Sequence, residues 1–123
     1  VNTTDFLETV ADLVGIDLAP LGLPKNDSRS FAPYLADPLQ KPLRTHAFSE
    51  NFKPLGFGPY TVLKRGLRDE RYKLITDMNA SEEFYDLLLD PYENAPLDLT
   101  ALTPAQQSAH AQLHLELTKL LNS

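Results

Sequence analysis

The sequence has three histidines, and two of them, His110 and His114, lie four residues apart. On a helix, this spacing places both imidazoles on one face, about one turn apart. Two imidazoles can bind a metal ion, but a site needs a third ligand, and the sequence has no H-E-x-x-H pattern. We therefore interpret the pair as part of a solvated helix face, and His46 as a partly buried structural histidine.

Three carboxylates lie close together in the stretch YDLLLDPYEN: Asp86, Asp90 and Glu93. The stretch lacks the alternating oxygen ligands and the central glycine of a calcium loop. We therefore expect Asp90 to start a turn that follows a strand. The charged stretch 68–73 is expected to be a hairpin tip with weak ion pairs, a phosphate or sulfate contact being the alternative.

Motifs of the common nucleophilic and nucleotide-binding sites are missing. The sequence contains no G-x-S-x-G, G-x-G-x-x-G or G-x-x-x-x-G-K-[ST]. It has no cysteine, which excludes thiolate catalysis, disulfides and cysteine-ligated metal centres. We predict no catalytic residue, no cofactor-binding residue and no metal ligand in this chain. Three glycosylation sequons, at Asn2, Asn26 and Asn79, matter only in a cell that glycosylates.

A chain of 123 residues, 42% of them hydrophobic, is long enough for one globular domain with its own core. The net charge of −6 argues against nucleic acid as a partner, because its phosphates would repel the chain. No apolar run approaches the ~18 residues of a membrane span. The chain begins with Val1 and its only methionine is Met78, so we expect it to be a piece of a longer protein.

The first 43 residues are predicted to form a helix and an irregular arm. Between Thr4 and Val14, apolar residues recur at helical spacing, and Gly15 provides a helix end. Five prolines in the stretch 16–43 exclude long regular structure. Within this arm we expect a polar turn at 25–28 and a short helical turn at 30–35, with Ser30 as its cap.

The remaining residues, 44–123, are predicted to form an antiparallel sheet and a helix that packs on it. Thr103 and Gln106 have the spacing of a capping box, and Pro104 suits the first helical position. An apolar stripe then continues to Leu121. We expect strands at 60–67, 72–76 and 83–87, a fourth strand at 45–50 and a loop at 51–59. The predicted fold class is α+β: an N-terminal helix and irregular arm, then a three- to four-stranded antiparallel sheet packed by a C-terminal helix.

Five stretches, taken in order, resemble segments of sulfatases of the alkaline-phosphatase superfamily. NTTDFLETVADLVGI is similar to D-x-x-P-T-[LI]-x-x-L-A-G-I, with Glu8 in place of proline. DSRSFAPYL is similar to D-G-R-S-L-x-P-x-L, with Ser28 in place of glycine. AFSE resembles a family strand that ends in glutamate, and GLRDERYKLI resembles the hairpin A-[VI]-R-T-x-R-Y-K-L-I. EEFYDLLLDPYEN resembles E-E-L-Y-D-L-x-x-D-P-x-E-x-x-N-L, with Pro96 in place of asparagine.

The resemblance implies the C-terminal part of a sulfatase. Residues 1–43 would be the end of the catalytic domain, and residues 44–123 the smaller C-terminal subdomain. Sulfatases hydrolyse sulfate monoesters with a formylglycine nucleophile and a calcium ion. This chain has no C/S-x-P-S-R, so calcium and formylglycine would belong to a missing upstream part, and the missing catalytic domain would be the partner. For the parent protein, the resemblance implies a periplasmic or extracellular location.

The loop 51–59 is the segment that we expect to reach a substrate. It carries Lys53 among aromatic residues, and a cation on an aromatic-bearing loop suits an anionic aryl or sugar sulfate. Asn51 and Lys53 are therefore candidate substrate-lining residues. The alternative is that this loop packs against the catalytic domain.

Two other functions stay open: a fragment of a phosphonate or phosphate monoester hydrolase, and a free-standing non-catalytic binding module. A fragment is expected to expose an apolar patch on the helix face 6–13 and on the arm, where the catalytic domain would dock. In isolation, that face could also drive homo-oligomerisation. A free-standing module is expected to bury its own apolar surface.

Overall fold

The computed structural model describes residues 3–24 and 28–122 and divides into two compact units, Val1–Thr45 and His46–Ser123. The polar turn expected at 25–28 falls mainly outside the described residues, as do the sequons at Asn2 and Asn26. In the part of the chain that is described, no helix has the length and apolar character needed to cross a bilayer.

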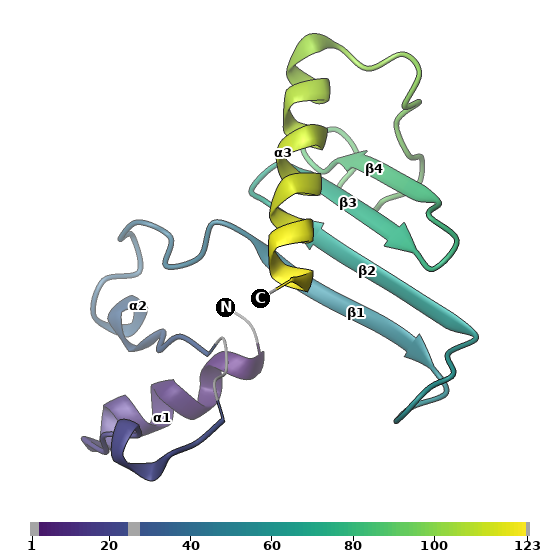
Figure 1. The fold of residues 1–123 in the computed structure, drawn as a ribbon. Coiled ribbons are helices and arrows are strands. Elements are labelled where there is room, and N and C mark those ends of the chain that lie inside the picture. The colour runs from purple at the N-terminus through teal and green to yellow at the C-terminus, as the bar shows by residue number, and fades with distance from the viewer. Residues whose placement is uncertain (1–2, 25–27, 123) are drawn as a thin grey trace. The chain divides into compact units, whose positions relative to one another are not determined.

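The first unit consists of helix α1 (Phe6–Val14), a winding arm and the short helix α2 (Ala32–Ala36), as Figure 1 shows. Single 3-10 turns precede α1 at Thr3–Asp5 and follow it at Ala19–Leu21. Gly15 ends α1 with φ at 72°, and its N–H donates toward the carbonyls of the last helical turn. The predicted helix and its stop are confirmed.

The face of α1 that packs within the first unit is the polar one. Asp5, Thr9 and Ala11 are buried, whereas the apolar side chains lie about half exposed. The exposed residues of α1 are Phe6, Leu7, Val10, Leu13 and Val14.

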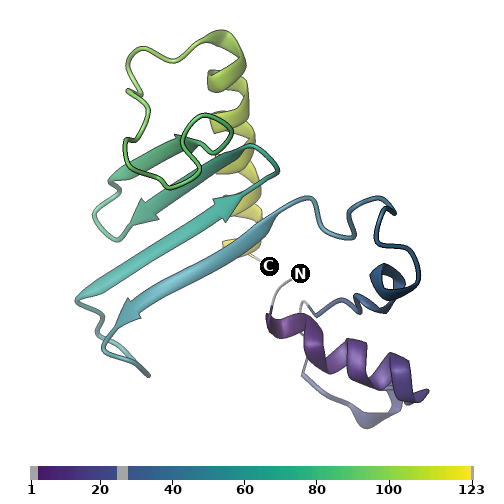
Figure 2. The same cartoon turned by 180° about the vertical axis from the view of Figure 1, so that it is seen from behind.

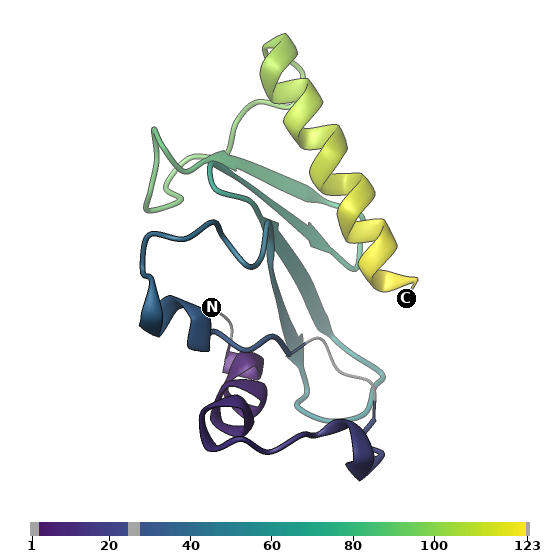
Figure 3. The same cartoon turned by 90° about the vertical axis from the view of Figure 1, so that its left-hand side faces the viewer.

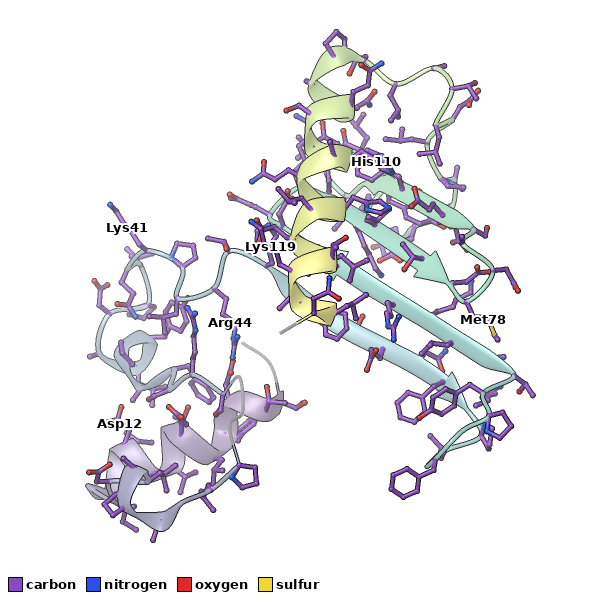
Figure 4. All side chains as sticks on the ribbon, in the orientation of Figure 1. Asp12, Lys41, Arg44, Met78, His110 and Lys119 are labelled. Atoms are coloured by element: carbon purple, nitrogen blue, oxygen red, sulfur yellow. The ribbon has the colours of Figure 1, made fainter. Side chains whose placement is uncertain are left out.

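Hydrogen bonds from the arm explain why the polar face is inside. The Asp5 carboxylate accepts from the backbone N–H of Arg29 at 3.0 Å and pairs with the Arg44 guanidinium. The Thr9 hydroxyl accepts from the N–H of Phe31 at 2.9 Å, and Ser30 donates to Asp12 at 2.7 Å. Figure 4 shows the Arg44 side chain extending from the arm toward α1. These bonds satisfy the buried polar groups.

The second unit is built on a four-stranded antiparallel meander, which confirms the fold class (Figure 1). Every strand pairs with the next one along the chain, in the order β1-β2-β3-β4. The strands are β1 (Ala47–Lys53), β2 (Val62–Arg68), β3 (Tyr72–Asp77) and β4 (Glu82–Asp86). The observed β1 ends three residues later than the strand expected at 45–50.

Helix α3 (Pro104–Leu121) covers one face of this sheet, as the side view in Figure 3 shows. Seen from behind in Figure 2, the sheet lies in front of the helix. Strand register aligns Leu67 with Leu74 and Leu74 with Phe84 across the sheet, and all three are fully buried. Leu113 and Leu117 of α3 complete this core.

The start of α3 matches its sequence pattern. The Thr103 hydroxyl accepts from the N–H of Gln106, and the Gln106 side chain accepts from the N–H of Thr103 at 2.9 Å. Pro104 occupies the first turn, where its missing N–H costs nothing. The apolar stripe is buried only at its centre, because Leu120 and Leu121 remain half exposed.

Candidate functional site

Asn51 and Lys53 lie in strand β1 and not in a loop, so the expected loop boundary was wrong. Asn51 pairs with Lys64 and Lys53 pairs with Val62 in β2. The strand continues because Phe52 also pairs with Leu63 in β2, and the Phe52 ring packs against Tyr60 with centroids 5.4 Å apart. This contact across the hairpin is not visible in the sequence around Phe52 alone.

Strand alternation places Asn51 and Lys53 on the sheet face opposite to α3. The reference is Phe48, an odd number of residues away, which packs against the core beneath the helix. Both side chains are exposed. Among the described residues, Lys53 has no carboxylate within ion-pair distance, whereas Lys64 on the neighbouring strand pairs with Glu83 at 3.0 Å. Lys53 therefore offers an ammonium group to an incoming anion.

The loop after Lys53 is tied together at its base. The N–H of Thr61 donates to the Lys53 carbonyl at 2.8 Å, and the Tyr60 hydroxyl donates to the Gly56 carbonyl at 3.0 Å. Gly56 has φ at 110°, a conformation that favours glycine. The two apolar side chains at the tip, Leu55 and Phe57, are 89% and 101% exposed. The loop thus presents apolar groups from a closed base.

The three carboxylates near the end of β4 each have a separate partner. Asp86 is buried and accepts from the Arg71 guanidinium at 2.7 Å, which holds the pKa of Asp86 below its usual value. Asp90 accepts from the N–H of Ala95 at 2.9 Å, the main cause of its lowered pKa. Glu93 pairs with a lysine of β3. These groups stabilise the turn predicted at Asp90.

No three His, Cys, Asp or Glu side chains among residues 3–24 and 28–122 are placed to hold a metal ion together. At the hairpin between β2 and β3, Arg68 donates to the carbonyl of Asp69 and Arg71 pairs with Asp86. These charged side chains therefore stabilise the turns and the strand ends of this region.

The interpretation of His110 and His114 as a solvated pair was wrong for His110. The Nε2 atoms of His110 and His114 lie 3.0 and 2.7 Å from the two carboxylate oxygens of Glu82. The His110 ring also packs edge-on against Phe84, with centroids 5.1 Å apart. No local sequence pattern indicates the contact with Glu82, because Glu82 is 28 residues away from His110. His46 is partly buried, as expected.

Comparisons with known proteins give matches among solved structures. No protein-family model and no curated protein matches the chain. A protein from Bacteroides thetaiotaomicron assigned to the sulfatases is 28% identical with a TM-score of 0.72, and the match covers 96% of this chain and 24% of that one.

Two further solved structures agree with this match. A 2-O GAG sulfatase is 28% identical with a TM-score of 0.71, over 96% of this chain and 24% of that one. A protein in complex with its substrate D-glucosamine-2-N,6-O-disulfate is 25% identical with a TM-score of 0.71, over 94% of this chain and 23% of that one. The chain thus spans about a quarter of the length of the proteins it matches. In sequence and in fold, the chain is similar to the C-terminal part of sulfatases, as its motifs indicated.

Proposed function

We propose that the chain is the C-terminal part of a hydrolase that cleaves sulfate monoesters. The supporting observation is the 28% identity over 96% of the chain to a protein assigned to the sulfatases. Residues 1–43 would end the catalytic domain and residues 44–123 would form the C-terminal subdomain. The nucleophile, formylglycine, and the calcium ion would belong to the upstream part, so the chain alone would be inactive.

The exposed apolar face of α1 supports the proposal that a partner domain is missing from this chain. A helix normally buries its apolar side and leaves its polar side in water. Here Asp5 and Thr9 are buried, while Phe6, Val10 and Leu13 stay half exposed. Contiguous exposed apolar groups mark interaction surfaces. We assign this face to the rest of the catalytic domain; in the isolated chain, a second copy would cover it.

Asn51 and Lys53 are the residues that we propose to line the substrate cleft. Both are exposed on one face of β1, and the Lys53 ammonium group has no ion pair among the described residues. A sulfate group would accept charge-assisted hydrogen bonds from it. The substrate class that we propose is a sulfated sugar, because one similar protein is a 2-O GAG sulfatase and another was solved with a glucosamine disulfate.

The native protein tests this proposal. We expect it to have a mass well above the 13.8 kDa of this chain, and peptide mapping is expected to recover an upstream peptide with C/S-x-P-S-R. The purified protein should release sulfate from D-glucosamine-2-N,6-O-disulfate, and calcium chelation should abolish the release.

Two outcomes would overturn the proposal in favour of the alternatives. Release of phosphate from a phosphate or phosphonate monoester, with no release of sulfate, would indicate the related hydrolase. A native species near 13.8 kDa would indicate a free-standing binding module.

A further inference from the structure

The tip of the loop 54–61 is the most exposed apolar feature of the second unit. Phe57 is 101% exposed and Leu55 is 89% exposed. An exposed aromatic ring gains nothing from folding, because water covers it as in the unfolded chain. Phe57 therefore contributes little to the stability of this unit.

The other two rings of the hairpin have structural partners. Phe52 and Tyr60 pack against each other with centroids 5.4 Å apart. The Tyr60 hydroxyl also donates to the Gly56 carbonyl at 3.0 Å, next to the tip. These contacts hold the two sides of the hairpin together and leave the Phe57 ring outside them. The loop thus presents Phe57 from a base that is already ordered, which lowers the entropy cost of binding.

The charge of this hairpin favours an anionic ligand. The chain has a net charge of −6, yet Lys53 is the only charged residue between positions 51 and 61. The hairpin end therefore combines one ammonium group with apolar surface and has no carboxylate of its own. Four extended residues span at most about 14 Å, so the Cα atoms of Lys53 and Phe57 lie within that distance. A ligand that carries both a ring and an anionic group matches the chemistry of these two side chains.

We propose that Phe57 and Lys53 form a contact site for an anionic ring, a sulfated sugar, in which the Phe57 ring stacks on the sugar and Lys53 pairs with a sulfate group. The identity of the ligand rests on the proposed function, whereas the site rests on the hairpin itself. Phe57 would then act on substrate affinity and choice and would take no part in bond cleavage.

Ligand affinity of the native, full-length protein tests the site without relying on turnover. We would measure Kd for D-glucosamine-2-N,6-O-disulfate and for unsulfated glucosamine by calorimetry after calcium chelation, so that no sulfate is released during the titration. Phe57→Ala is expected to weaken binding of the disulfate about three- to tenfold, and Phe57→Tyr is expected to restore it. Lys53→Met is expected to weaken binding of the disulfate about tenfold and to leave binding of the unsulfated sugar unchanged.

Tyr92→Ala is the matched control, because Tyr92 is an aromatic residue 84% exposed on a different turn of the same unit. It should leave Kd unchanged. Our inference is overturned if the wild type does not bind the disulfate, or if Phe57→Ala binds as tightly as Tyr92→Ala. It is also overturned if Phe57→Ala lowers the melting temperature with unchanged Kd, since Phe57 would then dock onto the rest of the protein. Binding without sulfate release would instead refute the proposed function and leave the site standing.

Discussion

The substitution Leu74→Ala tests the packing of the core most directly. Leu74 is fully buried at the centre of β3, in contact with the cluster formed by Leu67, Phe84 and Leu113. Leu74→Ala removes three carbon groups at about 0.8 kcal/mol each, or about 2.4 kcal/mol. The cavity left behind adds to this cost, so we expect a total loss of about 3–4 kcal/mol. That loss is a large part of the roughly 5–15 kcal/mol by which a domain is stable.

Urea unfolding of the 123-residue chain, followed by circular dichroism, measures this loss. Leu88→Ala is the matched control, because it makes the same chemical change at a turn position that is 71% exposed. We expect the control to cost less than about 0.5 kcal/mol, with the dependence on urea unchanged in both variants. The core assignment is refuted if Leu74→Ala costs less than about 1 kcal/mol, or if both variants cost the same.

Three further predictions concern the contacts around the sheet and the start of α3. Thr103→Ala should destabilise the second unit by about 1 kcal/mol in urea unfolding, because α3 loses its N-terminal cap. Arg71 lowers the pKa of Asp86, so this pair stabilises the fold above the usual value of 3.8 and loses its effect as the pH falls through the lowered pKa. Arg71→Met should therefore reduce the free energy of unfolding at neutral pH and make it less dependent on pH in acid. Urea midpoints measured from neutral pH down through the lowered pKa of Asp86 would show both effects. The hydrogen bond to Glu83 raises the pKa of Tyr85 from 10.0 to about 12, so stability is lost as the pH rises across this interval. Glu83→Gln should lower the Tyr85 pKa, which NMR of the tyrosine rings would detect.

Local patterns in the sequence were enough for the meander and the last helix. Alternation between polar and apolar residues predicted β2 and β3 within two residues of their observed bounds. The spacing of Thr103 and Gln106 predicted the start of α3, and the structure shows both hydrogen bonds of the capping box. Such features depend on residues a few positions apart, so a single sequence contains the information they need.

Features that depend on distant partners were missed. The end of β1 is fixed by the pairing of Lys53 with Val62, and the place of His110 is fixed by Glu82 on β4. Asn51 was likewise predicted in a loop, whereas the structure pairs it with Lys64 in the neighbouring strand. Each of these contacts requires the register of the sheet or the path of α3 across it, which no local pattern specifies.

The order of the strands has a consequence for how the second unit folds. Each strand pairs with its neighbour in sequence, so the hairpins can form from contacts between nearby residues, which favours rapid folding. Helix α3 is different, because it must return to a sheet whose first strand begins more than fifty residues earlier. Until it docks, the row formed by Leu67, Leu74 and Phe84 faces water. A chain in which α3 is truncated or slow to dock would therefore be prone to aggregate through this row, even with every hairpin formed.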